Sequence, residues 1–377
     1  MAPPLTTSAA TLAELTQPGT LYAPLPDRKL RCHACGHRCL ILDGHDGVCR
    51  VRFNRGGVLL VPHGYVSGMA ADPVEKKPFF HVLPGTVALS FGMLGCDLHC
   101  GYCQNWQTSQ TLRDPLSAAP TQKITPVEIA HLARQHGADI VTSTYNEPLI
   151  TSEWARAVFE EARRHELRTA FVSNGNATAE VLDYLKPWVD FYKVDLKSFN
   201  DHHYRQLGGK LDTVLRTIEL LWQKGFWVEV VTLIVPGFND SDAELRALAA
   251  FLAGISPDIP WHCTAFHPDY QMTDRDYTPA RTLVRACEIG TAAGLRYVYA
   301  GNLPGLTRGW ENTRCPQCQV TLIERRGFAV LSYQLTDTGT CPQCATPIPG
   351  RWDATRTHNA LRRFGRVDHF PHPVRRH

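Results

Sequence analysis

Long hydrophobic runs are missing from this sequence. No apolar stretch approaches the roughly 20 residues that a helix needs to cross a bilayer, so we expect no membrane-spanning segment. Net charge is also low, +3 at pH 7, and so weak a balance does not require a nucleic-acid partner. Residues 1–20 lack the basic and apolar regions of a secretory signal. We therefore expect a flexible leader over residues 1–27 and a cytoplasmic protein.

Cysteine, in contrast, is plentiful. Thirteen cysteines in a chain that has no secretory signal indicate metal ligation in a reducing compartment rather than disulfide bonds. Cys263 and Cys287 stand apart from the others, and single cysteines of this kind are usually small buried apolar residues. The remaining cysteines form three spaced groups, and each group is a candidate metal site.

The central group has the pattern C-x3-C-x2-C and consists of Cys96, Cys100 and Cys103. It follows an apolar run and a glycine-bearing turn, which places it at the carboxyl end of a strand, where α/β enzymes keep their chemistry. Three thiolates on one short loop can converge on a soft metal centre. A cubane [4Fe–4S] cluster takes four ligands, so three cysteines leave one iron open. The alternative is a structural zinc knuckle, which needs a fourth protein ligand, and His99 is the nearby candidate.

Two further groups, of four cysteines each, lie toward the two ends of the chain. The first has the pattern C-x2-C-x3-C-x9-C and consists of Cys32, Cys35, Cys39 and Cys49. It suits either a tetrahedral zinc site or an auxiliary iron–sulfur cluster, and the spacing does not choose between them. The second has the pattern C-x2-C-x22-C-x2-C and consists of Cys315, Cys318, Cys341 and Cys344. Two such knuckles at this distance predict a zinc ribbon.

Between residues 85 and 308, short apolar segments alternate with amphipathic ones, which predicts repeated strand–helix units with parallel strands. The expected strands are Val87–Phe91, Ile140–Thr144, Thr169–Ser173, Phe191–Val194, Val228–Val235, His262–Phe266 and Tyr297–Ala300. About six units fall short of the usual eight-unit barrel. We therefore predict an α/β fold with a partial (βα)6-type barrel. An N-terminal cysteine-rich subdomain (28–84), a C-terminal zinc-ribbon module (309–352) and a basic tail (353–377) flank it.

Polar segments follow most of the expected strands. They are Thr144–Pro148, Ser173–Asn176, Asp195–Lys197, Pro236–Asp240, His267–Tyr270 and Gly301–Gly305. Each is an ordinary turn sequence by itself, but a ring of such loops on one rim of a barrel indicates a functional site. Three histidines, His202, His203 and His262, are expected to be structural or at the surface. The charges of Glu75–His81 are expected to be solvated.

Taken together, these segments closely resemble the radical SAM (S-adenosylmethionine) proteins of the AmmeMemoRadiSam system, which are similar at the core to pyruvate formate-lyase activating enzymes. The resemblance runs from Cys32 to Trp352. It rests on the leading cysteine group, Glu75–His81, Cys96–Asn105, Thr144–Pro148, Trp261–Tyr270, Tyr297–Gly305 and the closing ribbon. It implies a barrel of the radical SAM type. It also implies an enzyme that reductively cleaves SAM to a 5′-deoxyadenosyl radical, which abstracts hydrogen from a substrate that the resemblance does not identify.

The same resemblance implies the cofactors and the partners. Cys96, Cys100 and Cys103 would hold a [4Fe–4S] cluster whose open iron binds SAM. Strand-end position and resemblance together give the expected SAM contacts: Glu147, Asn174, Asp195 and Lys197, with His267 facing SAM or substrate. The expected partners are an electron donor such as ferredoxin or flavodoxin, a Memo-like protein and an AMMECR-type protein, and a macromolecular substrate is compatible with this reading.

One segment departs from the wider superfamily. Radical SAM enzymes usually carry Gly-Gly-Glu-Pro after the second strand, and this chain has Tyr145-Asn146-Glu147-Pro148 there. Backbone carbonyls can still receive the amine of SAM, and asparagine is the non-glycine residue that best tolerates left-handed backbone. Glu147 keeps the carboxylate. The bulk of Tyr145 is expected to alter the shape of the pocket.

Two other functions remain open at this point. One is a glycyl-radical-enzyme activase, which the core resemblance suggests. The other is a non-catalytic, metal-stapled protein that binds RNA or another protein through the two outer cysteine modules and the tail Arg351–His377. Against the second stands the simpler interpretation that this arginine-rich tail is merely solvated.

Overall fold

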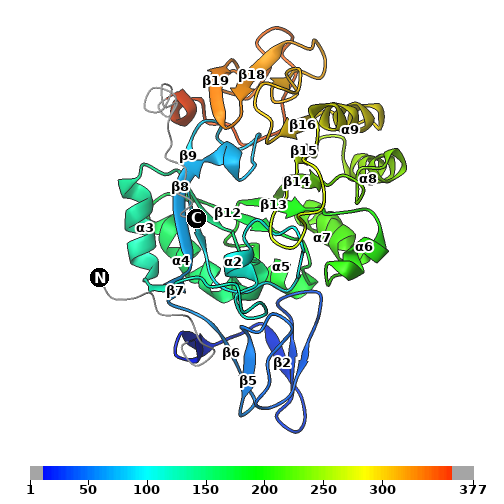
Figure 1. Cartoon of the computed structure of the whole chain (residues 1–377). Helices are drawn as coiled ribbons and strands as arrows, with labels where there is room; N and C mark the ends of the chain where they lie inside the picture. Colours follow the sequence, from blue (N-terminus) through cyan, green and yellow to red (C-terminus); the bar gives the residue numbers. More distant parts are fainter. Residues whose placement is uncertain (1–11, 359–377) are drawn as a thin grey trace.

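One twisted eight-stranded sheet organises the structure, a computed structural model that describes residues 12–358 (Figure 1). Its strand order is β16-β15-β14-β13-β12-β11-β9-β8. The strands are β8 (Gly68–Pro73), β9 (Val87–Gly92), β11 (Ile140–Ser143), β12 (Arg168–Ser173), β13 (Phe191–Asp195), β14 (Trp227–Ile234), β15 (Trp261–Ala265) and β16 (Val298–Gly301). Neighbours from β9 to β16 pair in parallel, and β8 pairs antiparallel with β9. The predicted α/β partial barrel is confirmed.

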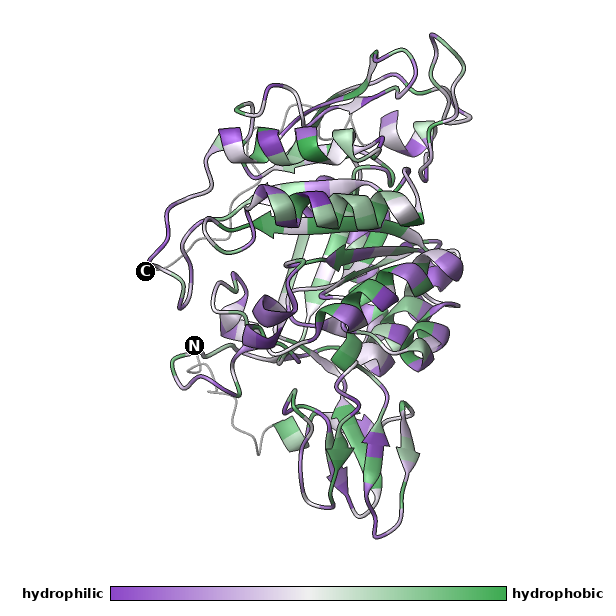
Figure 2. Ribbon diagram, turned by 90° about the vertical axis from the view of Figure 1, so that its right-hand side faces the viewer, coloured by the Kyte–Doolittle hydropathy of each residue, from purple (hydrophilic) through white to green (hydrophobic). Residues whose placement is uncertain are grey.

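Helices connect and cover the parallel strands. They are α3 (Pro126–Gln135), α4 (Ser152–Arg164), α5 (Ala179–Leu185), α6 (Asp201–Gln206), α7 (Leu211–Gln223), α8 (Asp242–Ile255) and α9 (Ala280–Ala292), with the short α2 (Trp106–Ser109) after β9. Figure 2 shows apolar strands beside helices whose surfaces alternate between apolar and polar residues. Trp154, Phe159 and Ile218 are fully buried in the core between these helices and the sheet. Burial of both faces explains why the strands read as apolar runs.

The N-terminal part forms small sheets at one end of the molecule (Figure 1). Their strands are β1 (Thr16–Pro18), β2 (Tyr22–Pro24), β3 (Leu30–Cys32), β4 (Leu40–Ile41), β5 (Phe53–Arg55) and β6 (Val58–Pro62), and β7 (Tyr65–Val66) pairs separately with β10 (Gln122–Lys123). The expected flexible leader differs from the structure in its second half, because β1 pairs with β6 and β2 pairs with β3. Both short strands supply backbone partners that β6 and β3 would otherwise lack. A buried ion pair between Arg52 and Glu153, 2.7 Å apart, anchors this part on α4.

The C-terminal ribbon lies at the opposite end of the sheet (Figure 1). It contains β17 (Thr313–Arg314), β18 (Thr321–Arg326) and β19 (Ala329–Tyr333), and its apolar side chains pack against Phe80, Tyr297 and Tyr299. Beyond the ribbon, Arg356 Nη1 lies 2.8 Å from Asp139 Oδ1, so the start of the predicted basic tail is docked rather than solvated. The rest of that tail, residues 359–377, lies outside the described residues.

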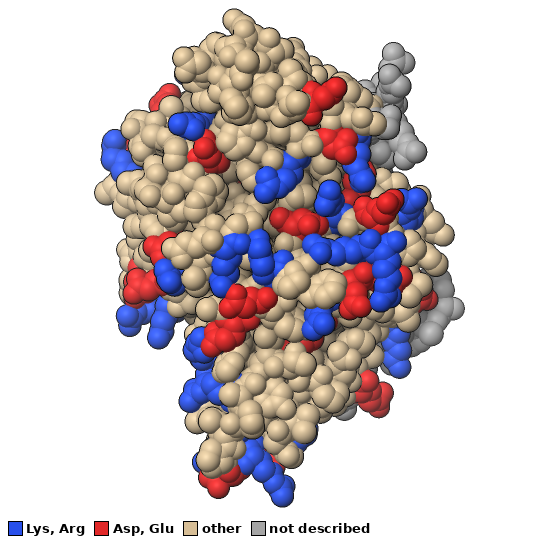
Figure 3. Space-filling model, turned by 180° about the vertical axis from the view of Figure 1, so that it is seen from behind, with Lys and Arg blue, Asp and Glu red and all other residues tan. Residues whose placement is uncertain are grey.

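Surface charge is mixed in sign. Figure 3 shows Lys and Arg next to Asp and Glu in a band across the back of the molecule. Ion pairs such as Arg163–Asp190 and Lys224–Asp183 belong to this pattern of opposite charges side by side. Within residues 12–358, no helix has the length and apolar character that crossing a membrane requires.

Candidate functional site

A cavity of about 440 Å³ lies at the carboxyl ends of the parallel strands. This is the place where sheets of this kind bind ligands, and the volume suits a cofactor-sized molecule. Three regions of the chain line it: the C-x3-C-x2-C loop, the strand ends, and residues that the sequence patterns did not assign to the site. The lining residues considered below are Cys96, Cys100, Cys103, Tyr145, Glu147, Asn174, Lys193, Asp195, Lys197, Glu75, Lys77, His262, Glu311 and Phe328.

The cysteine loop begins directly after β9, as the sequence predicted. Backbone hydrogen bonds fold it tightly, from Cys103 N to Cys100 O at 3.2 Å and from His99 N to Leu207 O at 2.9 Å. His99 is thus held against the loop before α7 by its backbone. The aromatic residue before the third cysteine, Tyr102, is buried in a small apolar cluster with Phe238, their ring centroids 6.0 Å apart. The loop is a rigid platform at one end of the cavity.

The three loop thiols line the same cavity, with Cys100 buried and Cys96 and Cys103 partly buried. Burial raises the pKa of Cys100 to about 12 and the pKa of Cys96 well above its usual range. Burial also raises the pKa of Cys103. Thiols that are this reluctant to ionise by themselves need a cationic centre to become thiolate ligands. Because three thiols of one short loop line one cavity, the residues present fit a soft metal centre.

Asp97 is the point where this loop joins the rest of the site. Its carboxylate accepts hydrogen bonds from Asn174 Nδ2 at 2.7 Å and from Asn176 Nδ2 at 2.8 Å. Asn174, a predicted SAM contact, also lies 4.0 Å from Cys96 Sγ through the same amide nitrogen. Sequence reasoning placed Asn176 in a polar loop but gave it no role of its own. The signal was the Asn-Gly-Asn sequence, in which Gly175 takes φ +75° to turn both amides to one side.

Glu147 is oriented by three donors. Oε1 accepts from Ser173 Oγ at 2.7 Å and from Leu149 N at 3.0 Å, and Oε2 accepts from Asn174 N at 2.7 Å. Burial, with help from nearby Asp97, raises the pKa of Glu147 to about 8. An ionised carboxylate here would gain from a cation in the cavity.

The left-handed residue of this segment is Tyr145, at φ +72°. The sequence argument had looked to asparagine for that conformation. Asn146 instead accepts a hydrogen bond from Met93 N at 2.9 Å through its side chain. The Lys77 ammonium nitrogen lies over the Tyr145 ring, 5.5 Å from the centroid of that ring. Tyr145 therefore forms part of the cavity wall, and the effect of its bulk on the shape of the pocket stays a prediction.

Asp195 and Lys197 both reach the cavity, and a third residue joins them. Lys193 Nζ contacts Asp195 Oδ1, and Lys197 Nζ lies 3.6 Å from Asp195 Oδ2. Burial opposes the charge of Asp195, but Lys193 and Lys197 outweigh it and hold the pKa of Asp195 below its usual range. Sequence reasoning missed Lys193. A lone lysine inside the apolar run Phe191–Asp195, two residues before an aspartate on the same strand face, was the available signal.

His267 lies outside the cavity lining. Its Nδ1 is 3.3 Å from Gln104 Nε2, and its Nε2 is 3.6 Å from Asp269 Oδ2. Gln104 lines the cavity and His267 does not. His267 therefore stands behind the cysteine loop, one side chain removed from the cavity.

His262 was expected to be structural, and it is buried with its Nε2 2.7 Å from Glu229 Oε2. It also lines the cavity. His202 is exposed on α6. His203 stacks on Phe238 with centroids 4.2 Å apart, which suits a structural role.

Two charged residues of Glu75–His81, Glu75 and Lys77, are not solvated, contrary to expectation, whereas Lys76 between them is exposed. Glu75 and Lys77 are 0% and 5% exposed, and both line the cavity. Lys77 Nζ lies 2.9 Å from Asp72 Oδ2, and Glu75 Oε1 lies 3.5 Å from Arg325 Nε. Arg325 comes from the ribbon, some 250 residues along the chain, and no local pattern could reveal it. Glu311 and Phe328 of the ribbon also line the cavity, so the ribbon forms one of its walls.

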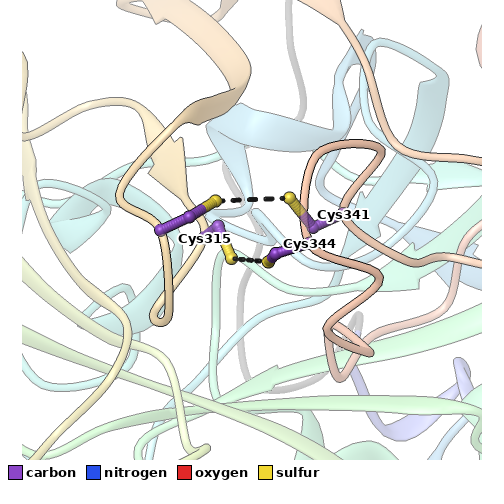
Figure 4. A group of neighbouring side chains, drawn as sticks. Cys315, Cys341 and Cys344 are labelled. Atoms are coloured by element: carbon purple, nitrogen blue, oxygen red, sulfur yellow. Dashed lines mark hydrogen bonds between the residues drawn. The ribbon is translucent and has the colours of Figure 1, made fainter.

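The ribbon cysteines converge on one point. Cys315 Sγ and Cys344 Sγ are 3.5 Å apart, and Cys318 Sγ and Cys341 Sγ are 3.6 Å apart. All four sulfur atoms lie within 4.8 Å of one another, and Figure 4 shows the labelled side chains pointing toward one another. Zn–S bonds of about 2.3 Å in a tetrahedral site put the sulfur atoms about 3.8 Å apart. The geometry fits one zinc ion.

The N-terminal cysteines surround the turn after β3. Cys32 ends that strand, and its N–H donates to Cys39 O at 3.0 Å, while Val48 N donates to Cys39 Sγ at 3.4 Å. Cys32, Cys35 and Cys49 are buried. Unlike the ribbon set, this group does not bring three or more sulfur atoms within 4.8 Å of one another. The two remaining cysteines, Cys263 and Cys287, are buried in the core as expected.

The chain is similar to proteins of one superfamily. The family model described as the radical SAM superfamily matches residues 92–252. An uncharacterized protein of Methanocaldococcus jannaschii is 37% identical over 330 residues, which cover 87% of this chain and 97% of that protein. The benzylsuccinate synthase activating enzyme of Thauera aromatica is 28% identical over 185 residues, 45% of this chain and 56% of that enzyme. A solved domain of a pyruvate-formate lyase-activating enzyme from Bacteroides vulgatus aligns with a TM-score of 0.39 at 19% identity, over 43% of this chain and 98% of that domain.

Proposed function

Because this chain belongs to the radical SAM superfamily, whose members are enzymes, we propose that it cleaves S-adenosylmethionine reductively at a [4Fe–4S] cluster held by Cys96, Cys100 and Cys103. The observation that carries the proposal is the cavity, in which all three cysteines lie opposite the polar strand ends. A single cavity that joins three metal-binding thiols to oriented polar groups suits a cofactor and a cosubstrate side by side. The radical would then abstract hydrogen from a substrate that remains to be identified.

When bound, the cluster supplies the electron that splits SAM into methionine and a 5′-deoxyadenosyl radical. The chain supplies position and charge. Glu147, fixed by Ser173 Oγ and two backbone N–H groups, would receive the ammonium group of SAM together with backbone carbonyls of the Thr144–Pro148 segment. Lys197 and Asp195 would meet the polar parts of SAM, with Asp195 held ionised by its two lysines. The ribbon wall would exclude water from the radical.

The test is anaerobic reconstitution with iron and sulfide, followed by reduction in the presence of SAM. The full chain should gain iron at the loop and release 5′-deoxyadenosine. The Cys96→Ala/Cys100→Ala/Cys103→Ala variant should lose about four irons per chain and all 5′-deoxyadenosine formation. Cys287→Ala is the matched control, since Cys287 is buried in the core on α9, belongs to none of the three cysteine groups and should change neither quantity. A triple variant that still releases 5′-deoxyadenosine at the original rate contradicts the proposal.

A second candidate within the same chemistry is activation of a glycyl-radical enzyme. Its support is the similarity to the activating enzymes of Thauera aromatica and Staphylococcus aureus, the latter a pyruvate formate-lyase-activating enzyme 24% identical over 190 residues. The chain spans 56% of the first and 74% of the second. Incubation of the reduced, SAM-loaded chain with a glycyl-radical enzyme should then give a doublet in the electron paramagnetic resonance spectrum. Absence of the doublet alongside active SAM cleavage would favour a different substrate.

The proposal includes a zinc ion at the ribbon cysteines, which their 3.5 and 3.6 Å pairs support. It also requires a low-potential one-electron donor, and a ferredoxin or flavodoxin has the right chemistry. A Memo-like protein, an AMMECR-type protein and a macromolecular substrate are proposed partners that follow from the family resemblance alone. A non-catalytic RNA- or protein-binding role would have no use for Glu147 and Lys193 buried in a cavity beside three thiols. An absence of SAM cleavage in fully reconstituted chain would favour that role.

A further inference from the structure

One side of the cavity carries none of the residues proposed to hold the cluster or SAM. Its walls include Glu75, Phe80, Glu311 and Phe328, and it is called the ribbon side below. Glu75 and Phe80 come from the segment between β8 and β9, whereas Glu311 and Phe328 come from the ribbon. A molecule other than SAM can therefore bind on the ribbon side, where the proposed function would place the substrate.

Glu75 has one carboxylate oxygen without a donor. Its Oε1 accepts a hydrogen bond from Gly85 N at 3.0 Å and lies 3.5 Å from Arg325 Nε. Its Oε2 is buried and has no hydrogen-bond partner among the residues that the structure describes. Glu75 is 0% exposed, and a buried polar group that lacks its hydrogen bond costs about 1–3 kcal/mol, or more when it is charged. Because Glu75 lines the cavity, a ligand there can supply the missing donor.

Arg325 does not supply it, although it is the nearest cation. Its Nη1 donates to Thr313 Oγ1 at 2.8 Å, and its Nη2 donates to Phe80 O at 2.7 Å. The two terminal nitrogen atoms of the guanidinium group therefore each hold a partner other than Glu75. Only Nε faces the carboxylate, and it approaches Oε1 rather than Oε2.

The two lysines that follow Glu75 in the chain are also directed elsewhere. Lys76 Nζ lies 2.8 Å from Asp72 Oδ1, and Lys77 Nζ lies 2.9 Å from Asp72 Oδ2. One aspartate thus holds both ammonium groups. The donor for Glu75 Oε2 has to come from a bound molecule.

A cationic donor suits this position best. Burial raises the pKa of Glu75 to about 7, although Arg325 opposes the rise. A second cation would favour the ionised carboxylate. Phe328, on the same side of the cavity, is 41% exposed, and an aromatic ring near a carboxylate suits an ammonium group on an apolar stem. Glu311 is a weaker candidate, because each of its oxygens already accepts a backbone N–H at 2.8 Å.

We propose that the ribbon side of the cavity binds a primary ammonium group, which donates a hydrogen bond to Glu75 Oε2 while its apolar stem lies against Phe328. The proposal rests on the proposed function in one respect, namely that the molecule carrying this group is the substrate of the radical. Glu75 is then a residue that selects substrates with an amino group. The group can belong to a small amine or to a lysine side chain, and both present the same chemistry to Glu75.

Calorimetric titration of the full chain with n-butylammonium chloride at pH 8 tests the proposal. Tetramethylammonium has the charge without an N–H group, and n-butanol has the stem without the charge. The wild-type chain should bind n-butylammonium about tenfold more tightly than either. Glu75→Gln should lose this preference, because an amide nitrogen then replaces one carboxylate oxygen. Glu324→Gln is the matched control, since it removes an exposed carboxylate from the same ribbon strand as Arg325 and should keep the preference.

Two further ligands and variants complete the design. Nα-acetyl-lysinamide presents the same ammonium group on a peptide backbone. Tighter binding of this ligand than of n-butylammonium would identify a lysine side chain as the source of the group, and weaker binding would identify a small amine. Phe328→Ala should weaken n-butylammonium more than methylammonium, which has almost no stem. This second variant tests the subsite independently if Glu75→Gln does not fold.

The outcomes separate this inference from the proposed function. Equal affinity for n-butylammonium and tetramethylammonium, or unchanged binding in a folded Glu75→Gln variant, would overturn the ammonium subsite. Loss of binding in Glu147→Gln with retention in Glu75→Gln would assign the amine to the other buried carboxylate of the cavity and would overturn it as well. The titration needs neither iron nor a reductant. A chain that binds the amine through Glu75 and does not cleave SAM would therefore keep the subsite and contradict the proposed function alone.

Discussion

Gly92 makes room for Tyr145. A Cβ atom on Gly92 would lie 2.8 Å from Tyr145 Cβ and 2.6 Å from the Thr144 carbonyl oxygen. Tyr145 stands where related enzymes usually have glycine, and it adopts φ +72°, a conformation that costs about 1 kcal/mol or more for a side chain of this size. The close approach of β9 and the segment after β11 thus depends on a glycine in the neighbouring strand. The pair explains how the cavity keeps its shape with a tyrosine in the wall.

Gly92→Ala should therefore destabilise the chain by about 1–3 kcal/mol, because the backbone at Thr144 must shift away from the new methyl group. Gly68→Ala is the matched control. Gly68 is the partner of Gly92 in the register of β8 and β9, but a Cβ atom there meets only Tyr145 Cδ2 at 3.7 Å, an ordinary contact. Thermal unfolding of both variants checks the prediction. Equal stability of the two variants would show that the Thr144–Tyr145 backbone yields without cost.

Arg325 and Glu75 form a buried ion pair between the ribbon and the sheet, with Nε and Oε1 3.5 Å apart. Burial raises the pKa of Glu75 to about 7, and Arg325 opposes that rise. Arg325→Met should cost about 3–5 kcal/mol of stability, since it leaves an uncompensated buried carboxylate. The loss should grow from pH 6 to pH 8. Without Arg325 the folded chain holds the Glu75 proton more tightly than the unfolded chain does, so stability falls as pH rises.

The double variant Glu75→Gln/Arg325→Met checks this mechanism. It removes both charges, so it should recover part of the lost stability and should lose the added pH dependence. Urea unfolding at pH 6 and pH 8 measures both quantities for the single and double variants. A double variant that is as unstable as Arg325→Met at pH 8 would assign the loss to packing of Arg325 on Phe80, whose ring centroid lies 4.3 Å from the guanidinium carbon.

Buried His81 makes the joint between sheet and ribbon sensitive to acid. Its Nδ1 lies 2.6 Å from Pro349 O, and its Nε2 lies 2.5 Å from Tyr299 Oη. A neutral ring that donates to Pro349 and accepts from Tyr299 satisfies both contacts. Burial, with smaller contributions from Arg325 and His262, lowers the pKa of His81 to about 4, although Glu229 and the hydrogen bond to Pro349 oppose this shift.

The unfolded chain binds one more proton than the folded chain between pH 4 and about 6.5, the ordinary value for histidine. Stability should therefore fall by about 3 kcal/mol as pH drops through this window. His81→Gln can keep both hydrogen bonds and does not titrate, so its melting temperature should fall less steeply. His136→Gln, at an exposed histidine, is the control and should follow the wild type. A wild-type slope in His81→Gln would assign the acid sensitivity to other groups, such as the buried pair His262–Glu229.

The positions of the parallel strands could be predicted from the sequence to within a few residues, because these strands are buried on both faces. A parallel strand buried on both faces reads as an apolar run, so Val228–Val235 was expected and Trp227–Ile234 is observed. The strand β8 was not assigned to the main sheet. It is a half-buried antiparallel edge strand, which leaves no continuous apolar run to recognise. Because the apolar runs identify the strands, they also identify the residues that follow each strand. Glu147, Asp195 and Lys197 were placed at the cavity in this way.

The parts that sequence reasoning missed depend on partners far along the chain. Glu75 looked solvated because its counter-ion Arg325 lies in the ribbon. Lys193 received no role in the sequence analysis, because a buried lysine in a strand is explained only by its ion pair with Asp195. His267 was expected to face SAM or substrate; it is not among the residues that line the cavity, but it contacts Gln104, which is, so its role stays a prediction. Strand-end position fixes the rim on which a residue lies, and packing decides which way its side chain faces.

The last prediction concerns zinc and the cavity wall. The ribbon has few apolar residues to form a core, so a metal ion at Cys315, Cys318, Cys341 and Cys344 would have to hold β18 in place. β18 carries Arg325, and the turn after it carries Phe328 at the cavity. The variant Cys341→Ser/Cys344→Ser should therefore lose one zinc per chain and melt at a lower temperature.

Iron content should be unchanged in this variant, because Cys96, Cys100 and Cys103 belong to the barrel and not to the ribbon. SAM cleavage in the absence of a substrate should continue. Exposure of the cavity to water should, however, speed quenching of the radical, so less of the radical should react with an added substrate. Metal analysis and calorimetry of the full chain make the first comparison, with Cys287→Ala as the control that removes a buried thiol outside all three groups. Retention of zinc by the double serine variant would exclude this site. Loss of iron together with zinc would show that the cysteine loop needs the ribbon in order to fold. The assumption that the ribbon and the cysteine loop are structurally independent would then be wrong.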